Sequence, residues 1–123
     1  MAPTPDSVYR YLSAREAGPE STDLANAERE AVRELLIALA RAAPGRSVEL
    51  RVPPYGATQL IQGPRHRRGT PSATVELDAT TLISLCLGEL AWGDAVAQGR
   101  VWASGERADL TEVLAGLALT DET

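Results

Sequence analysis

The sequence predicts an α+β fold, in which a single, mainly antiparallel sheet is covered by helices on one face. Two observations predict this class. Segments with the apolar period of a helix alternate with short segments in which every second residue is apolar. The strand-like segments are grouped in the middle of the chain and are followed by helices, a strand and a last helix, an order that is typical of layered α+β domains.

The length of 123 residues suits one domain with one core. We expect this domain to span residues 23–119. An N-terminal arm over residues 1–22, which prolines and a glycine interrupt, precedes it, and a tail over residues 120–123 follows it. Within the arm, Asp6 is predicted to cap a short helix whose tyrosines and leucine dock on the domain.

A long helix is predicted over residues 23–43, because apolar residues recur there at helical spacing and the pair Pro44–Gly45 ends the pattern. Charged side chains lie mostly off this apolar stripe. The stripe consists of Val32, Leu35, Leu36 and Leu39.

The period then changes to two. In residues 48–52 every second side chain is apolar, which predicts a strand with one buried face. A turn at residues 53–56 leads into residues 57–62, which we expect to pair with it in antiparallel orientation. Residues 65–71 are polar and predict a loop, and residues 73–77 alternate again as a strand.

The next helix is predicted over residues 79–90, with Asp78 as its N-cap. Its apolar residues cover most of the circumference, so it is either buried on nearly all sides or lines an interior cavity. These residues are Leu82, Ile83, Leu85, Cys86, Leu87 and Leu90.

A short helix, capped by Asp94 or Gly93, is predicted to end at Gly99. A strand over residues 100–104 follows, and Asp109 is predicted to cap a last helix that reaches Leu117.

Two tryptophans lie near the starts of this short helix and this strand. Trp92 either packs in the core beside Leu90 or forms part of a pocket wall. Strand alternation places Val101 and Ala103 inward, so Trp102 points outward, where a partner, a second subunit or the N-terminal arm is expected to contact it.

Composition excludes several classes of protein. The net charge of −5 argues against general nucleic-acid binding, because phosphate contacts need a positive field. Cys86 is the only cysteine, so no intrachain disulfide forms, which fits a cytoplasmic protein. The N-terminus lacks the pattern of a secretory signal, and no apolar run approaches the ~20 residues that span a bilayer.

No set of catalytic residues converges in the sequence, so we expect no enzymatic activity, metal or cofactor. His66 lies in a polar loop without nearby cysteines or paired carboxylates, and a solvated histidine is the better interpretation. Cys86 stands between leucines, where a thiol behaves as a small buried apolar group. Asp78, Asp94 and Asp109 each precede a helix, and capping explains all of them.

The one local anomaly of charge is the cluster of Arg65, Arg67 and Arg68. It is either a solvated hairpin tip or an anchor for an anionic headgroup or a fatty-acid carboxylate. Three arginines support at most transient contact with a membrane, since each contributes only ~1 kcal/mol near an anionic bilayer.

The second half of the chain resembles the sterol carrier protein-2 family. An apolar strand that ends in an acidic residue (73–78) is followed by a helix with a Leu-Gly-Glu-Leu ending. A short helix, the strand Gly-Arg-Val-Trp-Ala-Ser-Gly (99–105) and another helix come next, as in that family. Val-Glu-Leu-Arg-Val-Pro-Pro (48–54) is similar to its compact actinobacterial branch, and the resemblance covers about residues 24–117.

This resemblance implies a sheet of four to five strands with an apolar pocket between sheet and helices. It also implies a non-enzymatic carrier of a lipid, sterol, fatty acid or acyl-CoA. The same apolar residues also suit a solid core, in which case the chain is a cargo-free interaction module or a homodimer. The side chains expected to line the pocket are Leu60, Val75, Leu82, Leu85, Cys86, Leu90, Trp92, Val101, Leu114 and Leu117.

Overall fold

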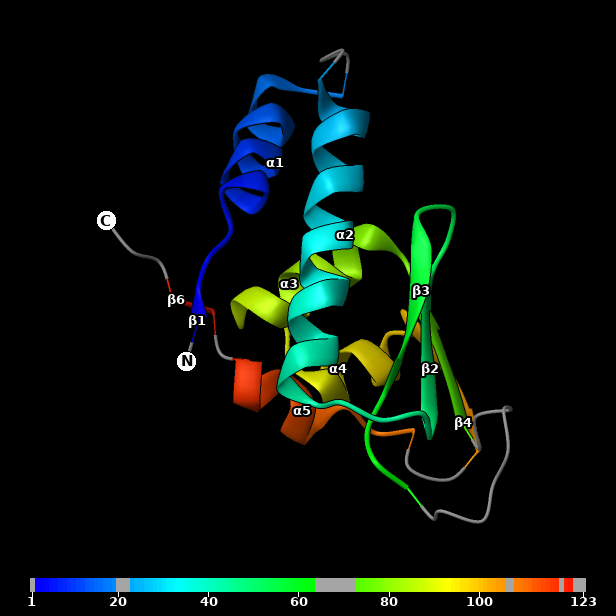
Figure 1. Ribbon diagram of the computed structural model, residues 1–123. Helices are drawn as coiled ribbons and strands as arrows, with labels where there is room; N and C mark the ends of the chain where they lie inside the picture. Colours follow the sequence, from blue (N-terminus) through cyan, green and yellow to red (C-terminus); the bar gives the residue numbers. More distant parts are fainter. Residues whose placement is uncertain (1, 20–22, 64–72, 106–107, 118, 121–123) are drawn as a thin grey trace.

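The computed structural model describes residues 2–19, 23–63, 73–105, 108–117 and 119–120. Figure 1 shows the helices gathered on one side of the main sheet. The helices are α1 (Asp6–Ala17), α2 (Leu24–Ala42), α3 (Ala79–Leu87), α4 (Trp92–Ala97) and α5 (Thr111–Leu117). The strands are β1 (Ala2–Pro3), β2 (Val48–Val52), β3 (Gly56–Leu60), β4 (Ala73–Leu77), β5 (Val101–Gly105) and β6 (Leu119–Thr120).

The main sheet has the strand order β3-β2-β4-β5, and β1 pairs with β6 in a separate short sheet. β2 is antiparallel to β3, and β4 is antiparallel to β5, as expected for a mainly antiparallel sheet. β2 and β4 run parallel, and β3 and β4 flank β2 on opposite sides. The predicted α+β class, with one sheet covered by helices, is therefore confirmed.

The core lies between the sheet and the helices. Val48, Leu50 and Val52 alternate along β2 with polar residues, and all three are fully buried. The register places Leu50 opposite Val75 of β4, so these side chains share the face that the helices cover. Helix α2 supplies the facing apolar stripe, in which Leu35 and Leu39 are fully buried.

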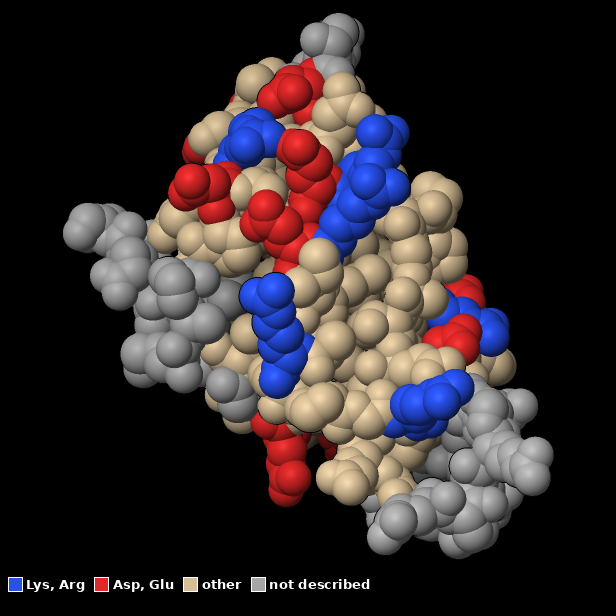
Figure 2. All heavy atoms as spheres, in the orientation of Figure 1, with Lys and Arg blue, Asp and Glu red and all other residues tan. Residues whose placement is uncertain are grey.

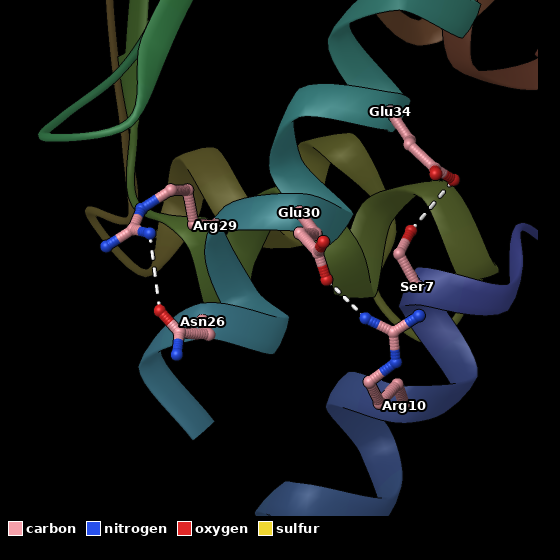
Figure 3. A network of polar contacts seen from close by, with 6 residues as sticks. All are labelled: Ser7, Arg10, Asn26, Arg29, Glu30 and Glu34. Carbon is pink, nitrogen blue, oxygen red and sulfur yellow. Dashed lines mark hydrogen bonds and ion pairs between the residues drawn. The ribbon is translucent and has the colours of Figure 1, made fainter. Parts of the chain in front are cut away.

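Helix α1 packs along α2 and adds Val8 and Tyr11 to the same core. At the surface of this contact, Ser7 Oγ donates a hydrogen bond of 2.9 Å to Glu34 Oε2 (Figure 3). Arg10 of α1 forms an ion pair with Glu30 of α2 beside it. Apolar burial and polar contacts therefore fix α1 on α2.

The N-caps observed in the structure agree with one of the predicted caps and differ from two others. Asp78 caps α3 as predicted, because its Oδ1 accepts a hydrogen bond of 2.8 Å from the backbone N–H of Thr81. The caps predicted at Asp6 and Asp94 are wrong. Pro5 occupies the N-cap position of α1 and Ala91 that of α4, so that both carboxylates lie in the first turn. In the first turn, these negative carboxylates still interact favourably with the positive end of the helix dipole.

Gly99 follows the end of α4 as predicted, whereas α5 begins at Thr111, one residue later than the predicted cap at Asp109 implies. Gly99, after α4, has a φ of +72°, which a glycine adopts without steric cost. Asp109 Oδ1 accepts a hydrogen bond of 2.8 Å from the N–H of Thr111 at the start of α5. Within the described part of the chain, no helix is both long and apolar enough to cross a membrane.

Candidate functional site

The predicted ligand-binding residues come together in one apolar cluster between the sheet and the helices. Most of them are buried: Leu60, Val75, Leu82, Leu85, Cys86 and Leu117. The others are partly buried and pack against this cluster: Leu90, Trp92, Val101 and Leu114. Their role in binding a ligand stays a prediction.

The helix layer covers the sheet unevenly. Val75 of β4 and Ala103 of β5 are directly opposite each other in the register, so both face the helices. Val75 is fully buried, whereas Ala103 is exposed and Val101 is only partly buried. The helices therefore cover the inner face of the sheet less completely at β5 than at β4.

The opposite face of β5 carries Trp102. This residue lies opposite Glu76 of β4 and is 62% exposed, so it points outward, as strand alternation predicts. Helix α1, which belongs to the N-terminal arm, packs against α2. The expected contact of Trp102 with a partner, a second subunit or the N-terminal arm stays a prediction.

The predicted headgroup anchor, Arg65, Arg67 and Arg68, lies outside the described residues, as does His66. Its role stays a prediction.

A groove of about 480 Å³ lies between α2 and β3, on the side of the sheet away from β5. The groove is open to the surface, and Figure 2 shows a mainly uncharged band there with basic groups around it. Its lining residues are Arg33, Leu36, Ile37, Ala40, Arg41, Tyr55, Gly56, Ala57 and Thr58.

This groove was not predicted from the sequence, although α2 carries a signal for it. Arg33, Ile37 and Arg41 follow one another at intervals of four residues, so they form one row along the helix. Ile37 lies off the core stripe and is 54% exposed. Ile37 lines the groove together with the apolar residues Leu36 and Ala40, and an apolar patch of this kind, rather than one exposed side chain, points to a contact surface.

A hydrogen bond fixes the side chain of Tyr55 at one end of the groove. Its hydroxyl donates to Glu28 Oε1 of α2 at 2.6 Å. This hydrogen bond, together with partial burial, raises the pKa of Tyr55 above its usual value, because the neutral phenol is the form that donates. The contact ties the turn before β3 to α2 and keeps that end of the groove in place.

Cys86 has the properties of a packing residue. Burial raises the pKa of its thiol to about 12, since the apolar surroundings disfavour the thiolate. We expect native protein at pH 8 to resist Ellman's reagent over the time in which urea-unfolded protein reacts fully. Rapid reaction of the folded chain, measured at 412 nm, would contradict this assignment.

The described residues hold no group of three or more His, Cys, Asp or Glu side chains arranged to bind a metal ion. Asp78 and Asp109 are both occupied in capping helices.

Comparison with solved structures finds sterol carrier proteins. The chain is similar to a UbiJ-SCP2 ubiquinone synthesis protein, with 15% identity, coverage of 68% of this chain and 74% of that chain, and a TM-score of 0.43. It is similar to Sterol Carrier Protein 2 Like 2 from Aedes aegypti, with 15% identity, coverage of 72% and 94%, and a TM-score of 0.42. It is also similar to apo Sterol Carrier Protein 2 from Yarrowia lipolytica, with 10% identity, coverage of 91% of this chain and 87% of that chain, and a TM-score of 0.40.

No curated protein matches the chain. The sequence profile of the family described as "Bacterial SCP ortholog" matches residues 25–115, which is most of the chain and includes α2, the main sheet and α3. This match confirms the resemblance seen in the sequence, and the chain belongs to the bacterial SCP ortholog family of sterol carrier protein-2-like proteins.

Proposed function

We propose that this chain is a non-enzymatic lipid carrier, which holds one lipid, sterol, fatty acid or acyl-CoA between its sheet and its helices. Family membership suggests a lipid-binding carrier. One observation supports the place of binding. On the inner face of the sheet, the helices leave Ala103 of β5 exposed, although Val75 opposite it on β4 is fully buried. Leu90, Trp92 and Leu114 are partly buried against the apolar cluster, and we expect an acyl chain to contact them.

The expected affinity suits a carrier. Burial of about 12 methylene groups contributes roughly 10 kcal/mol at ~0.8 kcal/mol each. Association costs about 4–15 kcal/mol in lost freedom of motion. The modest difference allows both capture and release of a lipid.

The two tryptophans provide an internal test of this proposal. Trp92 is partly buried against the cluster, and Trp102 is 62% exposed on the other face of β5. In a Trp102→Phe variant, the fluorescence of Trp92 should change saturably on titration with oleate, because its surroundings become drier. The matched Trp92→Phe variant, which reports from Trp102 alone, should change little.

Equal changes in both variants would indicate non-specific adsorption of oleate. The absence of a saturable change from Trp92, with oleate, cholesterol and palmitoyl-CoA each tried, would reject binding at this place. Both variants should be checked for an unchanged far-UV circular dichroism spectrum before titration.

The exposure of Trp102 favours a second candidate function, a protein-interaction module or homodimer that docks through β5. Sedimentation velocity of the wild type and of Trp102→Ala tests it, since a dimer that depends on this contact dissociates in the variant. A cytoplasmic location stays a prediction from the single cysteine.

A further inference from the structure

We infer that the groove between α2 and β3 binds an extended segment of a partner protein, which joins the sheet as a strand beside β3 and carries acidic side chains at positions i and i+4 with an apolar one at i+2. This inference does not depend on the proposed lipid site, whose expected entry is at β5, the other edge of the sheet. It is built from the strand order, the lining of the groove and the charges around it.

Strand β3 lies at an edge of the main sheet. Among the residues that the structure describes, it pairs with β2 alone. An edge strand presents unpaired N–H and C=O groups, and natural edges are usually protected by charged residues, proline or a covering element. The sequence of β3, Gly-Ala-Thr-Gln-Leu, contains no charge and no proline. Addition of a strand to such an edge is a recurring mode of peptide recognition.

The spacing of side chains on α2 matches the spacing along an added strand. Arg33, Ile37 and Arg41 are separated by four residues each, so the two arginines start about 12 Å apart along α2. Every second side chain of a strand faces the same way, and positions i and i+4 are about 13 Å apart. Because α2 and β3 run side by side (Figure 1), a strand along β3 presents three successive side chains to this row.

The positive charge at the rim of the groove comes from Arg33 and Arg41. Among the described residues the ion pairs join Arg10 with Glu30 and Arg51 with Glu49, and neither includes Arg33 or Arg41. Both of these arginines are exposed at the rim of the groove, with the exposed Ile37 between them. A partner with a carboxylate for each arginine and an apolar side chain for Ile37 complements the row.

The edge backbone also favours a peptide over a lipid in this groove. An acyl chain laid along β3 would cover its unpaired N–H and C=O groups without replacing their hydrogen bonds to water, and that burial is unfavourable. A peptide backbone forms those hydrogen bonds while its side chains fill the apolar space.

The probe is the peptide acetyl-Glu-Thr-Ile-Thr-Glu-amide, added to ¹⁵N-labelled full-length protein and followed by two-dimensional NMR. We expect saturable shifts that concentrate in the amides of β3 and of residues 33–41. The peptide with both glutamates replaced by glutamine, and the peptide methylated on alternate backbone nitrogens, should each bind at least about tenfold more weakly. Added salt should weaken the binding of the original peptide but not of the glutamine peptide.

Variants of the protein test the same assignment. Ile37→Asp and the double variant Arg33→Glu/Arg41→Glu should weaken the peptide at least about tenfold. Val96→Asp is the matched control, because Val96 is 47% exposed on α4 and does not line the groove. Exposed substitutions of this kind should leave the fold intact, which the NMR spectra report directly.

Three results would overturn the inference. One is the absence of shifts in β3 up to the solubility limit of the peptide. Another is equal binding by wild type, Ile37→Asp and the charge-reversed double variant. The third is displacement of the peptide by dodecanoate with shifts in the same amides, which would make the groove a lipid site. Failure of the oleate titration of Trp92 would leave the inference intact, because that readout concerns the edge at β5.

Discussion

Gly45→Ala is expected to lower the free energy of unfolding by about 3 kcal/mol or more, although it adds only one methyl group. Gly45 links α2 to β2 with a φ of +152°, which side-chain-bearing residues rarely adopt. A Cβ there would lie 2.0 Å from the carbonyl carbon of Ile61 and 2.3 Å from the backbone nitrogen of Gln62. Both contacts are with backbone atoms, so no side chain can turn away to relieve them.

The backbone at Ile61 is itself held firmly. Its N–H donates to the carbonyl of Ala43 at 2.8 Å, and its carbonyl accepts from Ser47 Oγ at 2.6 Å. Urea denaturation followed by circular dichroism measures the loss of stability. Gly93→Ala is the control, since its Cβ meets nothing within 4 Å in α4, and we expect it to be neutral or slightly stabilising. Equal stability of both variants would contradict the packing of Gly45 on Ile61.

Leu82→Ala is expected to cost about 2–5 kcal/mol in the free energy of unfolding. Leu82 lies on α3 and is 1% exposed within the cluster between sheet and helices. Truncation removes buried methyl groups and leaves a cavity that the surrounding side chains close only in part.

Leu87→Ala, on the same helix, provides the comparison. Leu87 is partly buried, so its truncation should cost clearly less than that of Leu82 in the same urea titration. A larger loss at Leu87 than at Leu82 would show that the core is arranged differently from the structure.

Local signals in the sequence predicted most of the elements. The alternation of Val48, Leu50 and Val52 identified β2 with its buried face, and Asp78 marked the start of α3, because both signals act over a few residues. The caps at Asp6 and Asp94 failed for a local reason. An acidic residue is favourable both at the N-cap and in the first turn, and sequence alone does not separate positions one to three residues apart.

Features that depend on tertiary arrangement were harder to predict. The apolar cluster was predicted because its members recur at strand or helix periods. The groove was not predicted, because Ile37 and Tyr55 are 18 positions apart in the sequence and only the packing of α2 on β3 brings them together. The exposed inner side of β5 was missed for the same reason, since alternation assigns Ala103 to a face but cannot say how far the helices extend over it.

The central claim is that this protein carries a lipid, and native mass spectrometry of gently purified protein tests it most directly. We expect a mass above that of the 13.1 kDa chain by one lipid at near one-to-one ratio, with the released molecule identified by extraction. A chain that is free of lipid as purified, and stays free after incubation with oleate, cholesterol and phosphatidylethanolamine, would contradict the claim. The same spectrum shows the mass of any dimer, so that outcome would leave the interaction module as the function to pursue.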